Sequence, residues 1–204
     1  MPENVPEIDR QQELDFIDKA RGGDTGSFSA LVELYQARAV HAAYSLVGNF
    51  EDARDLAQEA FVKAYEKLDG FQSQSRFYTW FYRILVNTCK DFLRKQKFRR
   101  AFSFWLGPED EGEETDPLQN VADRSENAYQ ALENRDLGRV VNEALEGLPF
   151  QQKSVFALRY LEGQSLEEIS QALEISVGAV KAHLWHACEK MRTRLKGVWE
   201  GEKP

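Results

Sequence analysis

Apolar residues recur along this chain at spacings of three and four, which is the period of a helix with one buried face. Leu31, Leu34, Tyr35 and Val40 are one such set, and no stretch alternates in the manner of a strand. We therefore expect an all-α fold. The expected helices cover about residues 9–22, 27–47, 50–68, 76–97, 126–145, 149–162, 165–173 and 177–197.

The pattern breaks once, at "GPEDEGEETDPLQN", where acids, glycine and proline replace the apolar residues. Such a composition cannot bury a core, so we expect a flexible acidic linker between two small helical domains. The expected boundaries are an N-terminal tail 1–12, a domain 13–100, the linker 101–125, a domain 126–197 and a C-terminal tail 198–204. The linker acids could act as a solvated spacer or screen basic surfaces of the chain.

Composition narrows the class of protein. A chain of 204 residues that is 42% hydrophobic is expected to fold, and its two cysteines, Cys89 and Cys188, are too far apart in sequence to suggest a disulfide framework. His183 and His186 near Cys188 form only a weak metal pattern, so we expect neither a metal nor a cofactor. No apolar run approaches a membrane span and no secretion signal opens the chain, which favours a cytoplasmic protein without membrane insertion.

The net charge of -8 conceals strong segregation along the chain. Residues 76–100 are basic, residues 109–126 are acidic, and the chain is basic again beyond Lys181. Two basic regions separated by an acidic tether suit a protein with two DNA-facing surfaces. The sequence offers no activated nucleophile or phosphate-binding loop, so we expect a binding protein and not an enzyme.

The segment "SLEEISQALEISVGAVKAHLWHACEKMRTRL" predicts a helix-turn-helix. Ser165 and Glu168 form a capping box, and Ser176 caps a second helix after a tight turn. An ordinary helical hairpin is the alternative. In a helix-turn-helix the second helix enters the major groove, and Arg192 and Arg194 would then lie nearer phosphate. The residues that would meet DNA are Ser176, Lys181, Ala182, His183, Trp185, His186 and Arg192.

The segment "EDARDLAQEAFVKAYEKLDGF" places a polar face on one helix. Leu56, Ala60 and Phe61 turn away from this face and are expected to be buried. Taken alone, such a face is ordinarily solvated. Its members, spaced at i, i+3, i+4 and i+7, are Asp55, Gln58, Glu59 and Val62.

The segment "FYTWFYRILVNTCKDFLRK" divides into two faces of one helix. Phe77, Phe81, Leu85 and Phe92 share the face expected to join the core, whereas Tyr78 and Tyr82 are ambiguous. The other face carries an aromatic and apolar wall, an amide and cations. Such a surface can stack on a base, read its edge and hold phosphates. Its residues are Trp80, Arg83, Ile84, Asn87, Lys90 and Arg94.

Together these segments resemble the extracytoplasmic-function (ECF) sigma factors of bacterial RNA polymerase. The resemblance is carried by "EDARDLAQEAFVKAY", "FYTWFYRILVNTCKDFLR", a charged linker and "LPFQQKSVFALRYLEGQSLEEISQALEISVGAVKAHLWHACEKMR". It covers about residues 13–100 as sigma region 2 and 126–197 as sigma region 4. The four blocks stand in the family's order, and there is no room for a region 3 domain, as in this family.

The resemblance implies a role for each surface. The face at Asp55, Gln58, Glu59 and Val62 would bind the clamp helices of the largest polymerase subunit, and the polymerase flap is a further implied contact. Region 4 would bind duplex −35 DNA, and region 2 would melt the −10 element and start transcription of a stress or envelope-response regulon under an anti-sigma factor. The pocket for a base flipped from the non-template strand would comprise Phe71, Gln72, Ser73, Gln74, Ser75, Ile84 and Asn87.

One departure from the family concerns the second helix of the helix-turn-helix. Many members carry several arginines there, whereas this chain has Lys181, His183 and His186, so bidentate recognition of guanine is lost at those positions. Two other classes of protein remain open. A stand-alone helix-turn-helix repressor or activator would leave the Asp55–Glu59 surface idle, and a helical anti-sigma or scaffold protein would not need the basic stripe.

Overall fold

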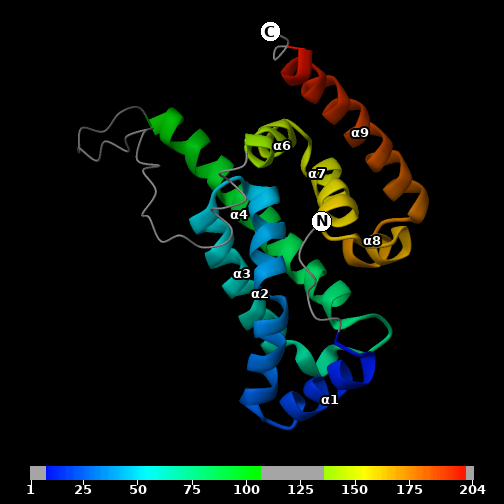
Figure 1. Cartoon of the computed structure of the whole chain (residues 1–204). Helices are drawn as coiled ribbons and strands as arrows, with labels where there is room; N and C mark the ends of the chain where they lie inside the picture. The colour runs from blue at the N-terminus through cyan, green and yellow to red at the C-terminus, as the bar shows by residue number, and fades with distance from the viewer. Residues whose placement is uncertain (1–7, 107–135, 201–204) are drawn as a thin grey trace.

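The computed structural model describes residues 8–106 and 136–200, and within these ranges it contains helices and turns but no strands (Figure 1). The expected all-α fold is therefore confirmed. A short 3₁₀ turn, η1, covers Leu68–Gly70, and a π-helical turn, η2, covers Ala157–Leu161. The α-helices are α1 (Arg10–Arg21), α2 (Thr25–Val47), α3 (Phe50–Glu66), α4 (Phe77–Leu106), α6 (Asp136–Glu146), α7 (Phe150–Phe156), α8 (Leu166–Leu173) and α9 (Val177–Glu200).

Local sequence explains where the helices of the first half begin and end. Gly48 adopts a left-handed conformation, with φ of 78°, which ends α2 at little steric cost. The side chain of Asn49 then accepts a hydrogen bond from the backbone N–H of Asp52 and starts α3. These two residues turn the chain sharply, so that α2 and α3 pack against each other.

Helices α1–α4 form one bundle, which we call the N-terminal bundle. Phe77, Phe81 and Leu85 are completely buried, as the helical spacing predicted, and the ring of Phe81 stacks on that of Phe61 at 4.3 Å. Phe92 is partly buried and packs against the same core. Tyr78 and Tyr82, which the sequence left ambiguous, are also buried.

Helices α6–α9 form a second bundle, the C-terminal bundle. The helix-turn-helix of α8 and α9 packs against α7, and Val180 and Ala187 on the inner face of α9 are buried. A smaller apolar cluster joins α6 to α9 through residues that include Leu145 and Met191.

The two bundles lie against each other. Figure 1 shows α6–α9 along one side of α2 and α4, and α8 packs directly on α4. One continuous buried cluster includes Leu31 of the first bundle and Val155 and Ile169 of the second. The two halves of the chain therefore share a core in this state.

One helix end differs clearly from the prediction. Helix α1 begins at Arg10, close to the expected residue 9, but α4 continues as far as Leu106 instead of ending near residue 97. Residues 101–106, expected to open the flexible linker, instead belong to α4. The rest of the expected acidic linker and the expected helical start at residue 126 lie in the stretch 107–135, outside the described residues. Within the described ranges, no helix is both long and apolar enough to cross a membrane.

Candidate functional site

The first candidate surface is the polar face of α3. Its four members, Asp55, Gln58, Glu59 and Val62, are all exposed. Val62, the apolar member, is 54% exposed. On the opposite side of α3, Leu56, Ala60 and Phe61 are buried, as predicted. We call this surface the α3 face.

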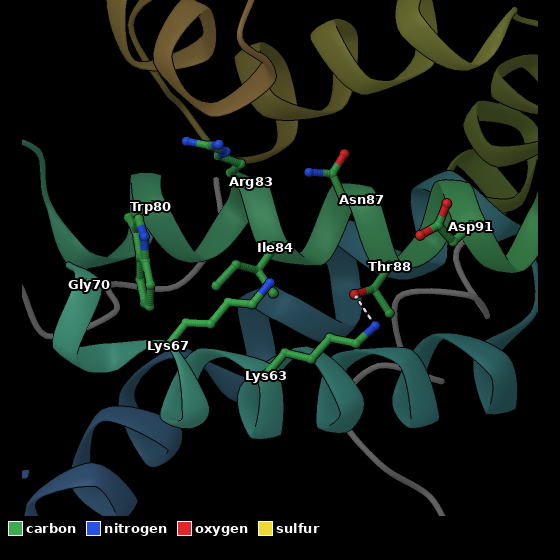
Figure 2. Close-up of a pocket in the computed structure, with 9 residues that line it drawn as sticks. All are labelled: Lys63, Lys67, Gly70, Trp80, Arg83, Ile84, Asn87, Thr88 and Asp91. Atoms are coloured by element: carbon green, nitrogen blue, oxygen red, sulfur yellow. Dashed lines mark hydrogen bonds between the residues drawn. The ribbon is translucent and has the colours of Figure 1, made fainter.

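The second candidate surface is a groove of about 490 Å³ between α3 and α4 (Figure 2). Trp80, Ile84 and Thr88 point from α4 toward α3, and Lys63 and Lys67 rise from α3 to meet them. The sequence predicted that Trp80, Arg83, Ile84 and Asn87 act together, and the structure brings all four to this groove. The lining, which we call the α3–α4 groove, is Lys63, Lys67, Gly70, Trp80, Arg83, Ile84, Asn87, Thr88 and Asp91.

Sequence reasoning missed the two lysines of the groove. Lys63 contacts Glu59 at 2.6 Å and donates a hydrogen bond to the Thr88 hydroxyl at 3.2 Å, so it ties the α3 face to the groove. Lys67 follows one turn later, just beyond the end of α3. Their i, i+4 spacing is the signal that could have placed both cations on one side of α3.

Phe71 and the loop after it lie beside the groove and are not among its lining residues. The Phe71 ring is buried, with its centroid 5.1 Å from that of Trp80, so in this arrangement it supports Trp80 and is not open to a base. Arg21 donates hydrogen bonds to the backbone carbonyls of Leu68 and Phe71. The loop comprises Gln72, Ser73, Gln74 and Ser75, and Ser73 holds a left-handed backbone with φ of 56°.

The cations of α4 form an exposed stripe beside the groove. Arg94 is paired with Asp91 at 3.3 Å, and Lys90 is exposed on the same helix. Arg83 forms a 2.6 Å ion pair with Glu174, which lies in the turn of the helix-turn-helix. One predicted DNA contact is therefore occupied by an acid of the second bundle.

The third candidate surface is α9. The predicted capping box is confirmed: Ser165 accepts from the backbone of Glu168, whose side chain accepts from the Ser165 N–H. Ser176 accepts a hydrogen bond from the N–H of Ala179, and so caps α9. Lys181, Ala182, Trp185 and His186 are exposed, whereas His183 is half-buried.

The two arginines predicted near phosphate differ in their surroundings. Arg192 is exposed and pairs with Glu189 at 2.7 Å. Arg194 instead donates hydrogen bonds to the backbone carbonyls of Ala144 and Gly147, because α6 ends beside it. In this state Arg194 holds α6 to α9.

The weak metal-binding pattern in the sequence consists of His183, His186 and Cys188. Within the described ranges no group of three or more metal-ligating side chains comes together. The Cys188 sulfur lies 3.5 Å from the hydroxyl of Tyr160.

The structure also reveals a polar cluster that the sequence did not suggest. The carboxylate of Glu162, which follows η2, lies against Arg38, His41 and Tyr78 of the first bundle. Burial raises the pKa of Glu162, but the hydrogen bond with His41 and the charge of Arg38 outweigh burial and leave that pKa lowered. Burial and the charge of Glu162 raise the pKa of Tyr78 well above its ordinary value. The cluster therefore contains an ionised carboxylate and a neutral phenol.

Each of the two bundles matches a known protein family. The Sigma-70 region 2 family matches residues 31–99, which include the α3 face and the α3–α4 groove. The Sigma-70, region 4 family matches residues 139–191, which include the helix-turn-helix.

Similar proteins and structures agree with this assignment. The chain is 34% identical to the ECF RNA polymerase sigma factor SigW of Bacillus subtilis, over 89% of this chain and 96% of that protein. It is also 34% identical to the ECF RNA polymerase sigma-E factor of Escherichia coli K12, over 88% and 92% of the two chains. The fold is similar to that of CnrH in complex with the cytosolic domain of CnrY, with a TM-score of 0.65 at 22% identity over 91% and 98% of the chains. The sigma factor RpoE of Bartonella quintana, in complex with the anti-sigma factor NepR, gives a TM-score of 0.63 at 23% identity over 83% and 96%. This chain therefore belongs to the ECF family of RNA polymerase sigma factors.

Proposed function

We propose that the three surfaces divide the work of promoter recognition. The α3 face binds core RNA polymerase at the clamp helices of its largest subunit, the α3–α4 groove holds the non-template strand of the −10 element, and α9 binds the −35 duplex. The corresponding units are region 2 (13–100), the linker (101–125), whose first six residues belong to α4, and region 4 (126–197). The observation that carries the proposal is the groove, which joins an aromatic wall, an amide and cations in one place.

The groove has the chemistry that an unpaired nucleotide needs. Trp80 and Ile84 provide an apolar surface for a base, Asn87 provides a donor and an acceptor for its edge, and Lys63 and Lys67 provide charge for phosphate. Extracting a base costs a few kcal/mol, and stacking on an aromatic returns about 1–3 kcal/mol per base. Capture of several nucleotides along α4 can therefore hold a locally melted duplex open without a fuel molecule.

The α3 face suits a polar protein contact. Asp55, Gln58 and Glu59 offer acceptors to basic residues, while the exposed Val62 adds a small apolar centre. Charges at such a surface set orientation and association rate more than total affinity. Flap contacts of region 4 complete the polymerase interface in this proposal.

The exposed side of α9 predicts the kind of −35 contact. Lys181 can donate to a base acceptor or a phosphate, Ala182 can contact a thymine methyl group, and Trp185 offers a large exposed ring. No arginine is among the side chains proposed to enter the major groove of the DNA, which are Lys181, Ala182, His183, Trp185 and His186. Recognition of the −35 element therefore does not rest on bidentate pairing with guanine.

The partners follow from the surfaces and from the relatives. CnrH and RpoE are each described in a complex, RpoE explicitly with an anti-sigma factor, and we propose that an anti-sigma factor controls this chain as well. In this proposal the present chain is a specificity subunit of the polymerase and not an enzyme itself. It works in the cytoplasm, where polymerase and promoter DNA meet.

Affinity for purified core polymerase tests the proposal. The double variant Asp55→Ala/Gln58→Ala should weaken binding by about tenfold or more, whereas Glu33→Ala, which removes an exposed acid from α2, should leave it unchanged. A chain that binds DNA but shows no measurable affinity for core polymerase would instead be a stand-alone helix-turn-helix regulator.

A further inference from the structure

The buried carboxylate of Glu162 joins the two bundles. Its side chain is only 2% exposed, although glutamate is rarely buried without partners. The π-helical turn η2 leads directly into it, and the Glu162 N–H donates to the carbonyl of Ala157 at 3.1 Å. Such turns are rare and are often found at functional positions. The turn delivers this carboxylate onto the surface of the N-terminal bundle.

The groups that receive the carboxylate all belong to α2 and α4. Arg38 Nε lies 3.1 Å from Oε2, and its Nη2 donates to the Glu162 backbone carbonyl at 3.1 Å. His41 Nδ1 lies 3.3 Å from Oε1, and the Tyr78 hydroxyl lies 3.2 Å from Oε2. We call Arg38, His41, Tyr78 and Tyr82 the carboxylate socket.

The socket is itself held in place by contacts within the N-terminal bundle. The Arg38 guanidinium stacks over the Tyr78 ring at 4.1 Å, and the hydroxyls of Tyr78 and Tyr82 are 2.6 Å apart. Both tyrosines belong to the core of the bundle. The socket therefore does not need region 4 to keep its shape, and it can exist before the carboxylate arrives.

We propose that the carboxylate socket is a binding site for the acidic side chain of Glu162, and that its occupation latches region 4 onto region 2 in a closed state that cannot engage a promoter. The inference rests on the proposed function, because it concerns how the same DNA surfaces are withheld and released. Two further contacts support the closed state: Arg83 pairs with Glu174, and Lys153 donates to the buried carbonyl of Leu46.

Geometry makes the closed state incompatible with promoter binding. The −35 and −10 elements are separated by about 25 base pairs, which is roughly 85 Å along B-form DNA. In this structure the turn of the helix-turn-helix contacts Arg83 of the −10 surface at 2.6 Å. One molecule therefore cannot bind the −35 and −10 elements at the same time until the two bundles separate. Opening would also free Arg83, whose charge is now paired with Glu174.

The latch is suited to being released. When the bundles separate, the charged groups of Glu162 and Arg38 become hydrated again. The favourable hydration free energy offsets much of the electrostatic attraction that is lost between them. Removing only one of the two leaves the other unpaired at the interface, which penalises the closed state and not the open one. A variant without the Glu162 carboxylate should therefore populate the open state more often.

Small-angle scattering of the free, full-length protein tests the latch directly. Glu162→Ala should raise the radius of gyration, and Arg38→Met, which keeps an apolar stem on α2, should do the same. Glu167→Ala, which removes an exposed acid from the first turn of α8, is the matched control and should leave the radius unchanged. Circular dichroism must show undiminished helicity in each variant. If Glu162→Ala loses helicity, the radius of gyration of Arg38→Met is the measurement that decides whether the latch exists.

Affinity for a short fluorescent single strand of mixed sequence provides the functional readout. Because apparent affinity scales with the fraction of competent molecules, both latch variants should bind about tenfold more tightly than the wild type, and the control should not. An unchanged radius of gyration and unchanged affinity in both variants would overturn the latch. Absence of strand binding by every protein, the wild type included, would count against the proposed function, while the scattering comparison would still decide the latch.

Discussion

Arg83 of α4 forms an ion pair with Glu174, with 2.6 Å between Nη2 and Oε1, and so links the groove of region 2 to the turn of the helix-turn-helix. Both side chains are about half exposed, at 47% and 59%, so the pair itself adds little stability. Its importance lies in what it occupies, because Arg83 lies at the rim of the groove where a nucleotide phosphate would bind.

Replacing Arg83 should change the salt dependence of strand binding. Arg83→Ala removes one phosphate contact, so the slope of log affinity against log salt for a single strand should fall by about 0.7. Titrations of holoenzyme with a −10 single strand at several salt concentrations provide the measurement. Glu174→Ala should keep the full slope, and an equal loss in both variants would contradict this role of Arg83.

Asn87 should matter for promoter opening and not for assembly. It is exposed at the groove and points to the same side of α4 as Arg83 (Figure 2). Loss of its amide should cost about 1–3 kcal/mol of base recognition, so Asn87→Ala should reduce open complexes about tenfold or more. Permanganate reactivity of unpaired thymines measures the opening. Gln96→Ala on the same helix should behave as wild type, and weakened polymerase binding by Asn87→Ala would refute the division of labour.

Lys181 should contribute to −35 binding through phosphate or base contact. It is exposed on the first turns of α9, next to Ala182. Lys181→Ala should weaken binding of holoenzyme to promoter duplex and reduce the salt slope by about 0.9. The fluorescence of the exposed Trp185 offers a second signal for duplex binding. A variant with unchanged affinity and slope would show that α9 meets DNA by another face.

The latch predicts a specific dependence of stability on pH. The ordinary pKa of Glu162 is 4.5 and the pKa in the folded protein is lower, so its stabilising contribution is complete above about pH 4.5 and is lost as pH falls through the folded value. Glu162→Gln removes this contribution. The difference in free energy of unfolding between wild type and Glu162→Gln, measured by urea titration from pH 7 to pH 3, should therefore shrink at the acid end. A difference that stays constant over this range would contradict an ionised, paired Glu162.

Sequence patterns predicted most of the local structure, but not the end of α4. We expected that helix to end near Lys97, where the basic run begins to give way to the linker. The next residues, among them Phe98, Ala101 and Phe102, include no helix breaker until Gly107 and Pro108, and α4 continues to Leu106. A change in polarity alone does not terminate a helix.

The candidate site was predictable where it lies on one helix and not where it joins distant segments. Trp80, Ile84 and Asn87 share a helical spacing, so their convergence at the groove followed from position alone. Arg38 and Glu162 are 124 residues apart, and no periodicity connects them. Phe71 was expected in an open base pocket, yet its apolar ring is satisfied by burial beside Phe77 and Trp80.

Run-off transcription with purified core polymerase tests the central claim most directly. Promoter fragments selected with the reconstituted holoenzyme serve as templates. The account predicts defined transcripts that require this chain, that are lost with Asp55→Ala/Gln58→Ala, and that persist with Glu33→Ala on α2. Binding of the selected fragments without any transcript dependent on this chain would contradict it.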